Sequence, residues 1–364
     1  MLPIQLPEYF IGLSTLTDTS VWRVLDVNAN RAAEGLRTIE DVARLVHEDS
    51  IASLWAKTLR HDLASAIAKL DRSQRLAARS TETDAGTGHT TDSESVRADW
   101  KAIISAACER VGQSLRCLEE FSKLVDESIG LEFKSLRYKS YDVLAQLELR
   151  LRRELIAKSA NLYLLIDCSL PIYKFADTVR QFAEAGADLL QLRDKSCDGA
   201  RLVAYARAAV RSLAGTHSKI IINDRVDVAL ASGAAGVHLG QEDMAYADAR
   251  CIAGPDLLIG ISTHSIEQAV AAEKDGADYI GCGPTFPSQT KSFDAFPGAL
   301  FLSQVAKQIS IPAFAIGGID ASNVGEALQT GCTRVAVSSA IHKSATPTET
   351  LQFIKRRLVQ RQVV

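Results

Sequence analysis

Asp188-Leu-Leu-Gln-Leu-Arg-Asp-Lys195 is a short apolar run that ends in a group of charged residues. Such a run is typical of a buried β-strand, and stretches with helical periodicity separate it from seven similar runs. The expected strands are Leu162–Asp167, Asp188–Arg193, Lys219–Asn223, Gly236–Leu239, Leu257–Ser262, Tyr279–Gly283, Ala313–Ile316 and Arg334–Val337. The expected helices lie near 175–185, 199–213, 225–232, 244–253, 265–275, 299–309, 321–330 and 348–360.

Eight β-α units in roughly 200 residues have the size and period of a (β/α)8 TIM barrel. A doubly wound sheet is the alternative fold, but the even spacing and the lack of a Gly-rich first turn argue against it. We therefore expect an α/β protein with a TIM barrel at 156–364, preceded by an all-α helical bundle at 1–155.

The first half of the chain is expected to be helical from about residue 20, except for a polar loop at Arg79–Asp92. Two of its segments recur. Arg31–Leu45 resembles Arg110–Leu124, shifted by 79 residues (31 to 110), and Leu54–Arg60 resembles Leu131–Arg137, shifted by 77 residues (54 to 131). We expect a bundle with an internal repeat and approximate two-fold symmetry. Chance similarity between amphipathic helices is the alternative.

The bulk composition bounds the class of protein. The chain has 364 residues, which favours two domains, and 47% hydrophobic with 23% charged residues is typical of a soluble globular protein. A net charge of −3 gives no reason to expect nucleic acid or a membrane surface as a partner.

The sequence shows neither a signal peptide nor a membrane span, and its seven cysteines form no CxxC pair. We expect a cytoplasmic protein with reduced core thiols; a homo-oligomer is left open.

Polar residues gather where the expected strands end, which is where TIM barrels carry their chemistry. Alternation along the second strand sends Gln191, Arg193 and Lys195 to the interior of the mouth. An amide and two cations so close together favour a clamp for a polyphosphate. A surface salt-bridge cluster with Asp194 is the alternative.

Two carboxylates follow neighbouring strands, Asp224 after the third and Asp243 after the fourth. They could share one hard cation, and Mg²⁺ prefers one or two carboxylates with substrate phosphate and water. Asp224 could instead cap the next helix, and Glu242 could replace Asp243 as the ligand. We expect His238 to pack at its strand end rather than to bind metal.

The later strand ends suit anions. The loop Gly283–Ser292 carries hydroxyls and a lysine, which fits a lid over an anionic substrate. Gly317-Gly318 and Ser338-Ser339 end the last two strands, where glycines and backbone N–H groups often bind a phosphate. Ser262 ends the fifth strand, and a simple helix cap is its alternative role. One monophosphate site and a separate diphosphate clamp imply two anionic substrates.

Together these motifs resemble the thiamine phosphate synthase family, and they occur in that family's order across the second half of the chain. The motifs are QLRDK (191–195), IINDRVDVAL (221–230), GVHLGQED (236–243), Ser262, GPTFPSQTK (283–291), AIGGI (315–319) and VSSAI (337–341). The resemblance implies that hydroxymethylpyrimidine diphosphate condenses with thiazole phosphate in the biosynthesis of thiamine diphosphate. It also implies a dissociative alkyl transfer that depends on positioning and charge neutralisation.

The resemblance assigns roles residue by residue. Pyrimidine diphosphate would be held by Gln191, Arg193, Lys195, Asn223, Ser262 and Lys291, and the catalytic cations would be Arg193, Lys195 and Lys291. Mg²⁺ would bind Asp224 and Asp243. The residues implied for thiazole phosphate are Ser288, Thr290, Gly318, Ser338 and Ser339. The chain has Ser288-Gln-Thr290-Lys291 where the family usually has Thr-x-Thr-Lys, so a hydroxyl is retained.

The alternative function is that of a thiazole tautomerase or regulatory relative, which binds thiazole without joining it to a pyrimidine. Such relatives lack the diphosphate clamp and the metal carboxylates, so Arg193, Lys195, Asp224, Asp243 and Lys291 argue for the synthase. A sugar- or indole-phosphate barrel is a weaker alternative, because it would need no second anion site.

The helical half carries two polar helix faces, which are Glu34, Arg37, Asp41 and Arg44 in the first repeat and Gln113, Arg116, Glu120 and Lys123 in the second. On the pattern alone these faces are solvated and laced with ion pairs. This half resembles the helical domain fused ahead of some thiamine phosphate synthases, which is associated with phosphorylating hydroxymethylpyrimidine phosphate. The matching stretches are 28–45, 59–63, 78–87 and 109–124.

That resemblance implies ATP as a second substrate, and it places the polar faces and the Arg79–Thr87 loop against the nucleotide and the pyrimidine phosphate. The alternative is a non-catalytic module for dimerisation or regulation.

Overall fold

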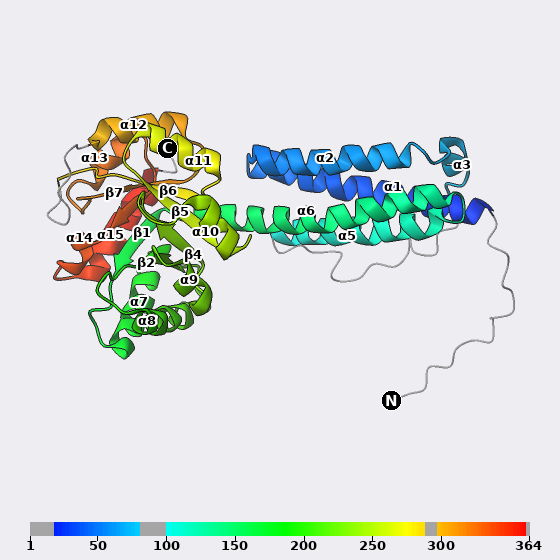
Figure 1. Cartoon of the computed structure of the whole chain (residues 1–364). Helices are drawn as coiled ribbons and strands as arrows, with labels where there is room; N and C mark the ends of the chain where they lie inside the picture. The colour runs from blue at the N-terminus through cyan, green and yellow to red at the C-terminus, as the bar shows by residue number, and fades with distance from the viewer. Residues whose placement is uncertain (1–17, 81–99, 288–296, 362–364) are drawn as a thin grey trace. The chain divides into compact units, whose positions relative to one another are not determined.

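The computed structural model describes residues 18–80, 100–287 and 297–361, and it divides the chain into two compact units, 1–152 and 153–364 (Figure 1). Within the described residues, no helix combines the length and the apolar character that crossing a membrane requires.

The first unit is a helical bundle. Its elements are α1 (Asp18–Asp41), the π-helical turn η1 (Val42–Val46), α2 (Ser50–Ile67), α3 (Arg72–Ala77), α5 (Trp100–Ser122) and α6 (Glu127–Ser159). Asp49 starts α2 by accepting hydrogen bonds from the N–H groups of Ile51 and Ala52. Gly35 lets α1 approach α5 closely, since a Cβ there would lie 2.7 Å from Val111 Cγ2.

Two ion pairs, each with a buried glutamate, connect the helices of this bundle. Glu40 accepts a hydrogen bond from Arg60 at 2.7 Å, and Glu119 accepts one from Arg137 at 2.6 Å. Both glutamates are buried, and the two pairs occupy corresponding positions of the segments that repeat at shifts of 79 (40 to 119) and 77 residues (60 to 137). The buried core of this unit consists of apolar side chains, among them Leu25, Leu36 and Phe133.

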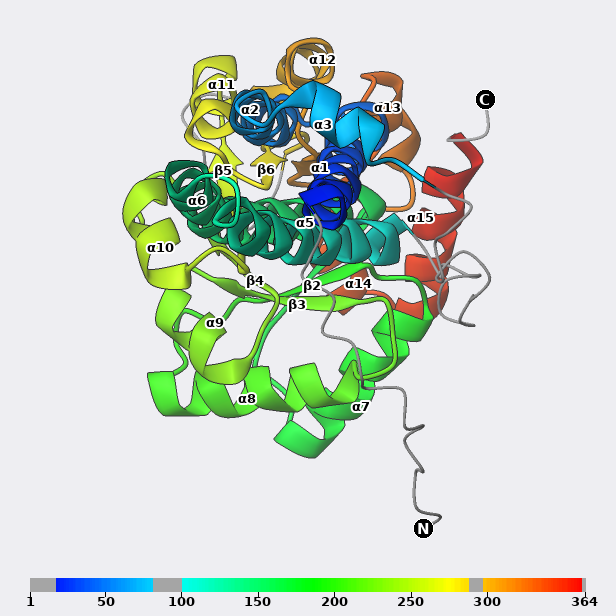
Figure 2. The same cartoon turned by 90° about the vertical axis from the view of Figure 1, so that its right-hand side faces the viewer.

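The second unit is a closed barrel of eight parallel strands in the order β1 to β8, with helices outside (Figure 2). The fold class expected from the sequence is therefore confirmed. The strands are β1 (Leu162–Ile166), β2 (Leu189–Leu192), β3 (Lys219–Asn223), β4 (Gly236–Leu239), β5 (Leu258–Thr263), β6 (Tyr279–Cys282), β7 (Ala313–Ile316) and β8 (Val335–Val337). The helices are α7 (Ile172–Glu184), α8 (Gly199–Ser212), α9 (Val226–Ser232), α10 (Tyr246–Ala253), α11 (Ile266–Asp275), α12 (Gly298–Gln308), α13 (Val324–Gln329), α14 (Ser339–His342) and α15 (Pro347–Arg361).

Alternate strand residues fill the inside of the barrel, and the others pack against the helices. The inner cluster contains Tyr163, Tyr279 and Phe314, whose rings meet edge to face. Gly260 makes room for this cluster, because a Cβ there would lie 2.1 Å from Tyr279 Cζ. The interior of the barrel is thus a packed core. The cavity of the barrel lies beyond this core, at the C-terminal ends of the strands.

Two aspartates form hydrogen bonds and ion pairs that stabilise the N-terminal end of the barrel. Asp188 accepts hydrogen bonds from the N–H groups of Asn161 and Leu162 and from Lys355 Nζ. On the other side, Asp278 accepts from Ile259 N and pairs with Arg153 and Arg250 at 3.0 and 2.8 Å. These carboxylates connect strands and helices, which is a structural role.

Candidate active site

A cavity of about 210 Å³ opens at the C-terminal mouth of the barrel. Strand ends supply its walls, and residues from β2, β3, β5, β7 and β8 meet there. The predicted site residues that line it are Gln191, Arg193, Asn223, Ser262, Gly318, Ser338 and Ser339. The structure therefore brings together residues that lie almost 150 positions apart in the sequence (191 to 339).

A buried hydrogen-bonded chain forms the floor of this cavity. Gln191 Nε2 donates to the Tyr163 hydroxyl at 2.8 Å, and that hydroxyl lies 3.0 Å from the hydroxyl of Tyr279. His238 continues the chain, with Nδ1 3.2 Å from the Tyr279 hydroxyl and Nε2 2.9 Å from Ser262 Oγ. The two predicted residues Gln191 and Ser262 are thus held at opposite ends of one network.

His238 is a buried, uncharged member of that chain. Burial lowers its pKa to about 4, an effect that Asp243 opposes and Arg193 adds to. Both ring nitrogens have partners, so the side chain packs and orients its neighbours, as we expected. Ser262 does not cap a helix, because Ser265 is the N-cap of α11.

The carboxylates of Asp224 and Asp243 lie next to each other in the segments that follow β3 and β4. Burial raises the pKa of Asp224, and the neighbouring Asp243 raises it further. Asp224 also has a left-handed backbone, with φ of 62°, a conformation that costs energy and occurs often at functional sites. The residue does not cap α9, whose N-cap is Arg225.

Lys195 reaches this pair, with Nζ 3.8 Å from Asp224 Oδ2. Asp194, by contrast, accepts hydrogen bonds from Ser196 and from the backbone of Cys168. The cations of the expected clamp therefore point to the mouth rather than to Asp194. Two opposed carboxylates beside a lysine supply hard oxygen donors, so the residues present fit a Mg²⁺ ion.

The ends of β7 and β8 bring glycine close to the loop after β6. Gly317 and Gly318 have positive φ values of 99° and 67°. A Cβ on Gly318 would lie 2.8 Å from the carbonyl oxygens of Phe286 and Pro287. Only glycine fits this position without a backbone shift. A second hollow, of about 640 Å³, continues outward from Gly318 and Ser339 to Lys343.

Sequence reasoning missed several residues of this mouth. His264 lines the cavity, and its Nδ1 lies 2.7 Å from the carbonyl oxygen of Gly283. Lys343 follows Ser339 by one helical turn, a spacing that could have singled it out. Tyr163 and Tyr279 gave no polar signal, because they sit inside apolar strands. The predicted residues Ser288, Thr290 and Lys291 lie outside the described residues.

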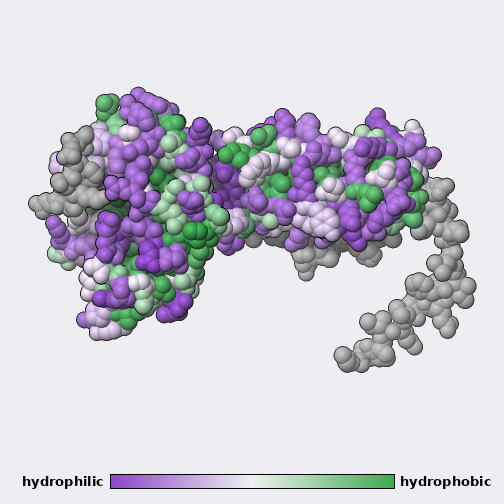
Figure 3. Space-filling model, in the orientation of Figure 1, coloured by the Kyte–Doolittle hydropathy of each residue, from purple (hydrophilic) through white to green (hydrophobic). Residues whose placement is uncertain are grey.

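Ion pairs connect the charged side chains on the polar faces of the helical unit. In α1, Arg37 pairs with Asp41 at 3.1 Å, and Asp41 also pairs with Arg44. In α5, Glu120 pairs with Arg116 and Lys123 at 2.9 and 3.0 Å. Hydrophilic residues accordingly cover much of the visible face of this unit (Figure 3). The ion-paired surface expected from the pattern alone is therefore present.

One hollow of about 640 Å³ lies on the helical unit between α5 and α6. Gln113 and Arg116 of the second polar face line it, together with Tyr141 and Glu148 of α6. Of the loop expected at Arg79–Asp92, only Arg79 and Ser80 are among the described residues, and Arg79 donates two hydrogen bonds to the Asp26 carboxylate.

Comparison with known proteins accounts for both units. The thiamine monophosphate synthase family model matches residues 162–341, and the ThiD2 family model matches residues 23–146. A thiamine-phosphate synthase of Rhodopirellula baltica is 45% identical over 333 residues, which cover 88% of each chain. One of Nostoc punctiforme is 40% identical and covers 93% of this chain and 94% of its own length.

This chain belongs to the thiamine-phosphate synthase family. A solved thiamine phosphate pyrophosphorylase from Pyrococcus furiosus resembles it with a TM-score of 0.51 and 33% identity, covering 58% of this chain and all of that one. The family, the transferase class and the role in thiamine biosynthesis expected from the sequence are thus confirmed. The helical unit carries the ThiD2 match.

Proposed function

We propose that the barrel mouth condenses hydroxymethylpyrimidine diphosphate with thiazole phosphate, releasing diphosphate and thiamine phosphate. The observation that carries this assignment is the pair Asp224 and Asp243, which face each other beside Lys195 at the edge of the cavity. A barrel that only bound or isomerised a thiazole phosphate would have no use for a second anion site built from carboxylates and cations.

The diphosphate end of the pyrimidine substrate would lie at the β2, β3 and β4 strand ends. Arg193 and Asn223 line the cavity there, and Lys195 adds a second positive charge. Gln191 and Ser262, held by the buried chain, would contact the pyrimidine ring with fixed orientation. Two cations within reach of one leaving group favour the departing charge more than the bound ester.

The thiazole phosphate would lie on the opposite side of the mouth. Gly318, Ser338 and Ser339 line that wall, and glycine lets a phosphate approach the backbone closely. Lys343 borders the same hollow and would add a favourable charge. Ser288 and Thr290 complete the set that we expect from the sequence.

The reaction breaks the bond between the pyrimidine methylene carbon and its diphosphate oxygen, and the electron pair leaves with diphosphate. The thiazole nitrogen then donates its lone pair to that carbon. Arg193, Lys195 and Lys291 would stabilise the departing charge, and the walls would keep the nitrogen in line with the carbon. When bound by Asp224 and Asp243, Mg²⁺ would neutralise further charge on the leaving diphosphate.

The test is a synthase assay on the full chain with thiazole phosphate, Mg²⁺ and hydroxymethylpyrimidine diphosphate. Thiamine phosphate should form, and omitting Mg²⁺ should abolish it. If no thiamine phosphate appears while thiazole phosphate still binds, the protein is a thiazole-binding relative and the synthase assignment fails.

We further propose that the helical unit phosphorylates hydroxymethylpyrimidine phosphate with ATP, which would supply the substrate that the barrel consumes. The ThiD2 match over residues 23–146 supports this second activity. The hollow between α5 and α6 is our candidate for its site, because Gln113 and Arg116 line it from a polar face that the resemblance implicates.

The full chain should then convert the monophosphate and Mg²⁺·ATP to the diphosphate and ADP. The variant Asp224→Asn, which disables only the barrel, should keep this activity. Arg116→Ala should weaken it, whereas Arg110→Ala, an exposed arginine on the same helix, should not. Failure to form ADP would leave a non-catalytic helical module and would not affect the synthase assignment. We place both activities in the cytoplasm and propose no nucleic-acid or membrane partner.

A further inference from the structure

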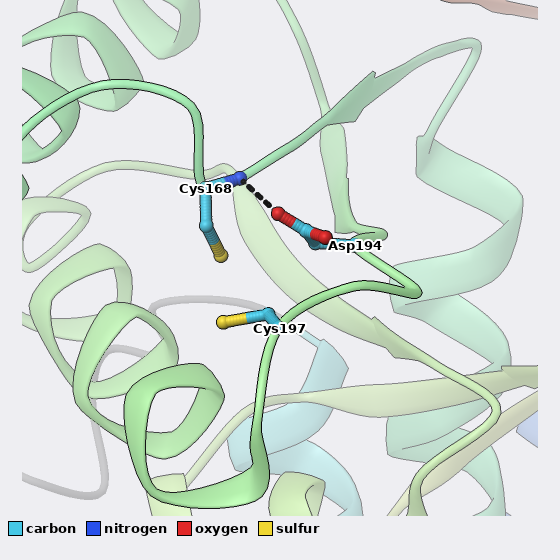
Figure 4. A group of neighbouring side chains, drawn as sticks. All are labelled: Cys168, Asp194 and Cys197. Atoms are coloured by element: carbon cyan, nitrogen blue, oxygen red, sulfur yellow. Dashed lines mark hydrogen bonds between the residues drawn. The ribbon is translucent and has the colours of Figure 1, made fainter.

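Three potential metal ligands meet beside the mouth, outside the site described above (Figure 4). Cys168 lies just after β1, and Asp194 and Cys197 lie in the loop between β2 and α8. The two Sγ atoms and a carboxylate oxygen of Asp194 all lie within 4.8 Å of one another. In Figure 4 the two thiols point toward each other, and the Cys168 N–H donates to Asp194 at 3.3 Å.

No sequence motif pointed to this cluster. Its cysteines are 29 positions apart (168 to 197) and form no CxxC motif, yet parallel neighbouring strands bring their loops together. Our expectation of core thiols holds for Cys168, Cys282 and Cys332, which are buried, and for Cys108 and Cys197, which pack against the cores. It is wrong for Cys251, which is exposed. Cys197 is only partly buried, so a solvated ion could reach the cluster from its side.

The thiols of this cluster differ from the other buried thiols in their partners. Cys332 Sγ donates to the carbonyl oxygens of Ala313 and Arg334, and Cys282 Sγ bonds to Thr263 Oγ1. Cys168 instead has Cys197 as its side-chain partner. Burial raises the pKa of Cys168, and Cys197 raises it further. A bound cation would reverse this cost, because it favours both thiolates at once.

Hydrogen bonds keep the Asp194 carboxylate ionised and hold its orientation, and both properties suit a metal ligand. Ser196 donates to Asp194 Oδ1 through its side chain and its backbone, and these bonds hold the pKa of Asp194 below its usual range. The carboxylate is therefore ionised and fixed in orientation at neutral pH. The guanidinium of Arg201, which donates to the Cys168 carbonyl oxygen, limits the negative charge that the site would carry.

We propose that Cys168, Asp194 and Cys197 bind one thiolate-preferring divalent cation of the Zn²⁺ class. Two sulfur ligands and one oxygen are a donor set that Mg²⁺ disfavours and Zn²⁺ accepts, with the fourth position left to water or to a ligand. The ion would join the loop after β1 to the loop after β2. Because Arg193 and Lys195 flank Asp194, it would fix the segment that carries the cations of the mouth.

The experiment is a titration of the reduced full chain with Co²⁺ and with Zn²⁺, in the presence of saturating Mg²⁺. Co²⁺ bound through thiolates gives an intense charge-transfer absorption in the near ultraviolet, which Co²⁺ at the Asp224–Asp243 pair would not give. We expect one equivalent of Co²⁺ to produce this band and Zn²⁺ to displace it. Zn²⁺ should also slow alkylation of Cys197 by iodoacetamide about tenfold, because a bound thiolate is a poor nucleophile.

The variants Cys197→Ser and Asp194→Asn should lose or weaken the band, and Cys251→Ser, which removes an exposed cysteine on α10, should keep it. Both loop variants change partly exposed side chains, so circular dichroism should show a folded barrel in each. The proposal is overturned if the parent gives no thiolate band, or if the band survives in Cys197→Ser. Neither result depends on the synthase assay.

Discussion

At the N-terminal end of the barrel, Asp188 and Asp278 are each held by backbone N–H groups and by Lys or Arg side chains. At the C-terminal end, Asp224 and Asp243 face each other, and Lys195 is 3.8 Å from the first. Aspartates thus stabilise the folded barrel at its N-terminal end and destabilise it at its C-terminal end. Carboxylates that repel each other are retained where a ligand can relieve the repulsion.

The contrast distinguishes carboxylates that stabilise the barrel from carboxylates that serve its reaction. The carboxylates at the N-terminal end have stabilising partners within the chain, so their removal should destabilise the barrel. Those at the mouth repel each other, and their partners within the chain are few: Lys195 lies 3.8 Å from Asp224, and the Gly240 N–H donates to Asp243. Removal of Asp224 should therefore stop turnover and leave the fold intact. Two substitutions test this division directly, and two more test the buried chain and the phosphate wall.

Asp224→Asn should have the largest effect, a loss of about a thousandfold in kcat/KM, since a charge that assists the leaving diphosphate is removed. Steady-state synthase kinetics at several Mg²⁺ concentrations measure it. The matched control is Asp227→Asn, an exposed residue of α9 that pairs with Arg225. The Tm of Asp224→Asn should equal or exceed that of the parent, because the variant relieves both the repulsion and part of the buried charge. A lower Tm with normal kinetics would place Asp224 with the structural carboxylates.

Asp278→Asn should lower the free energy of unfolding by about 3 kcal/mol, because it breaks a buried ion-pair network. Arg153 and Asp278 each have only 7% of the side chain exposed, and Arg250 shares the same carboxylate. Urea denaturation measures the change, with Asp275→Asn, an exposed position on α11, as the control. Folded Asp278→Asn should retain the parent kcat. A large loss of kcat without loss of stability would contradict the division.

The sequence predicted the mouth better than the interior. Apolar runs of fixed period predicted the eight strands, and the rule that chemistry follows strand ends singled out Gln191, Arg193 and Asp224. The buried chain through Tyr163, Tyr279 and His238 could not be predicted, because which inward side chains meet depends on barrel closure. The Cys168–Cys197 pair was missed because its residues are far apart in the sequence and meet only through the pairing of β1 with β2.

Because His238 is buried, its protonation should make the free energy of unfolding depend on pH. Its pKa is about 4 in the folded protein and about 6.5 when unfolded, so the unfolded chain binds the proton first as pH falls. The contribution of His238 is complete above pH 6.5 and is lost as pH falls toward 4. The loss should be on the order of 2 kcal/mol in the free energy of unfolding.

Urea denaturation of the parent and of His238→Gln at pH 4.5 and pH 7 measures this effect. Protonation of other groups affects both proteins, so the difference between their pH dependences isolates His238. The parent should lose more stability than the variant. Equal losses would mean that the imidazole titrates normally and that the floor of the mouth is open to water.

Gly318→Ala should have the smallest effect, an increase of about tenfold in KM for thiazole phosphate with little change for the pyrimidine, since a displaced donor costs roughly one hydrogen bond. The added Cβ would meet the Phe286 and Pro287 carbonyl oxygens at 2.8 Å and push the β7 end away from its ligand. Gly233→Ala is the matched control, because its φ of 73° imposes similar backbone strain while a Cβ there meets no atom within 4 Å. Both variants should lose comparable stability from the left-handed backbone, but only Gly318→Ala should change KM. A KM change shared by both would trace the effect to general strain and remove Gly318 from the phosphate wall.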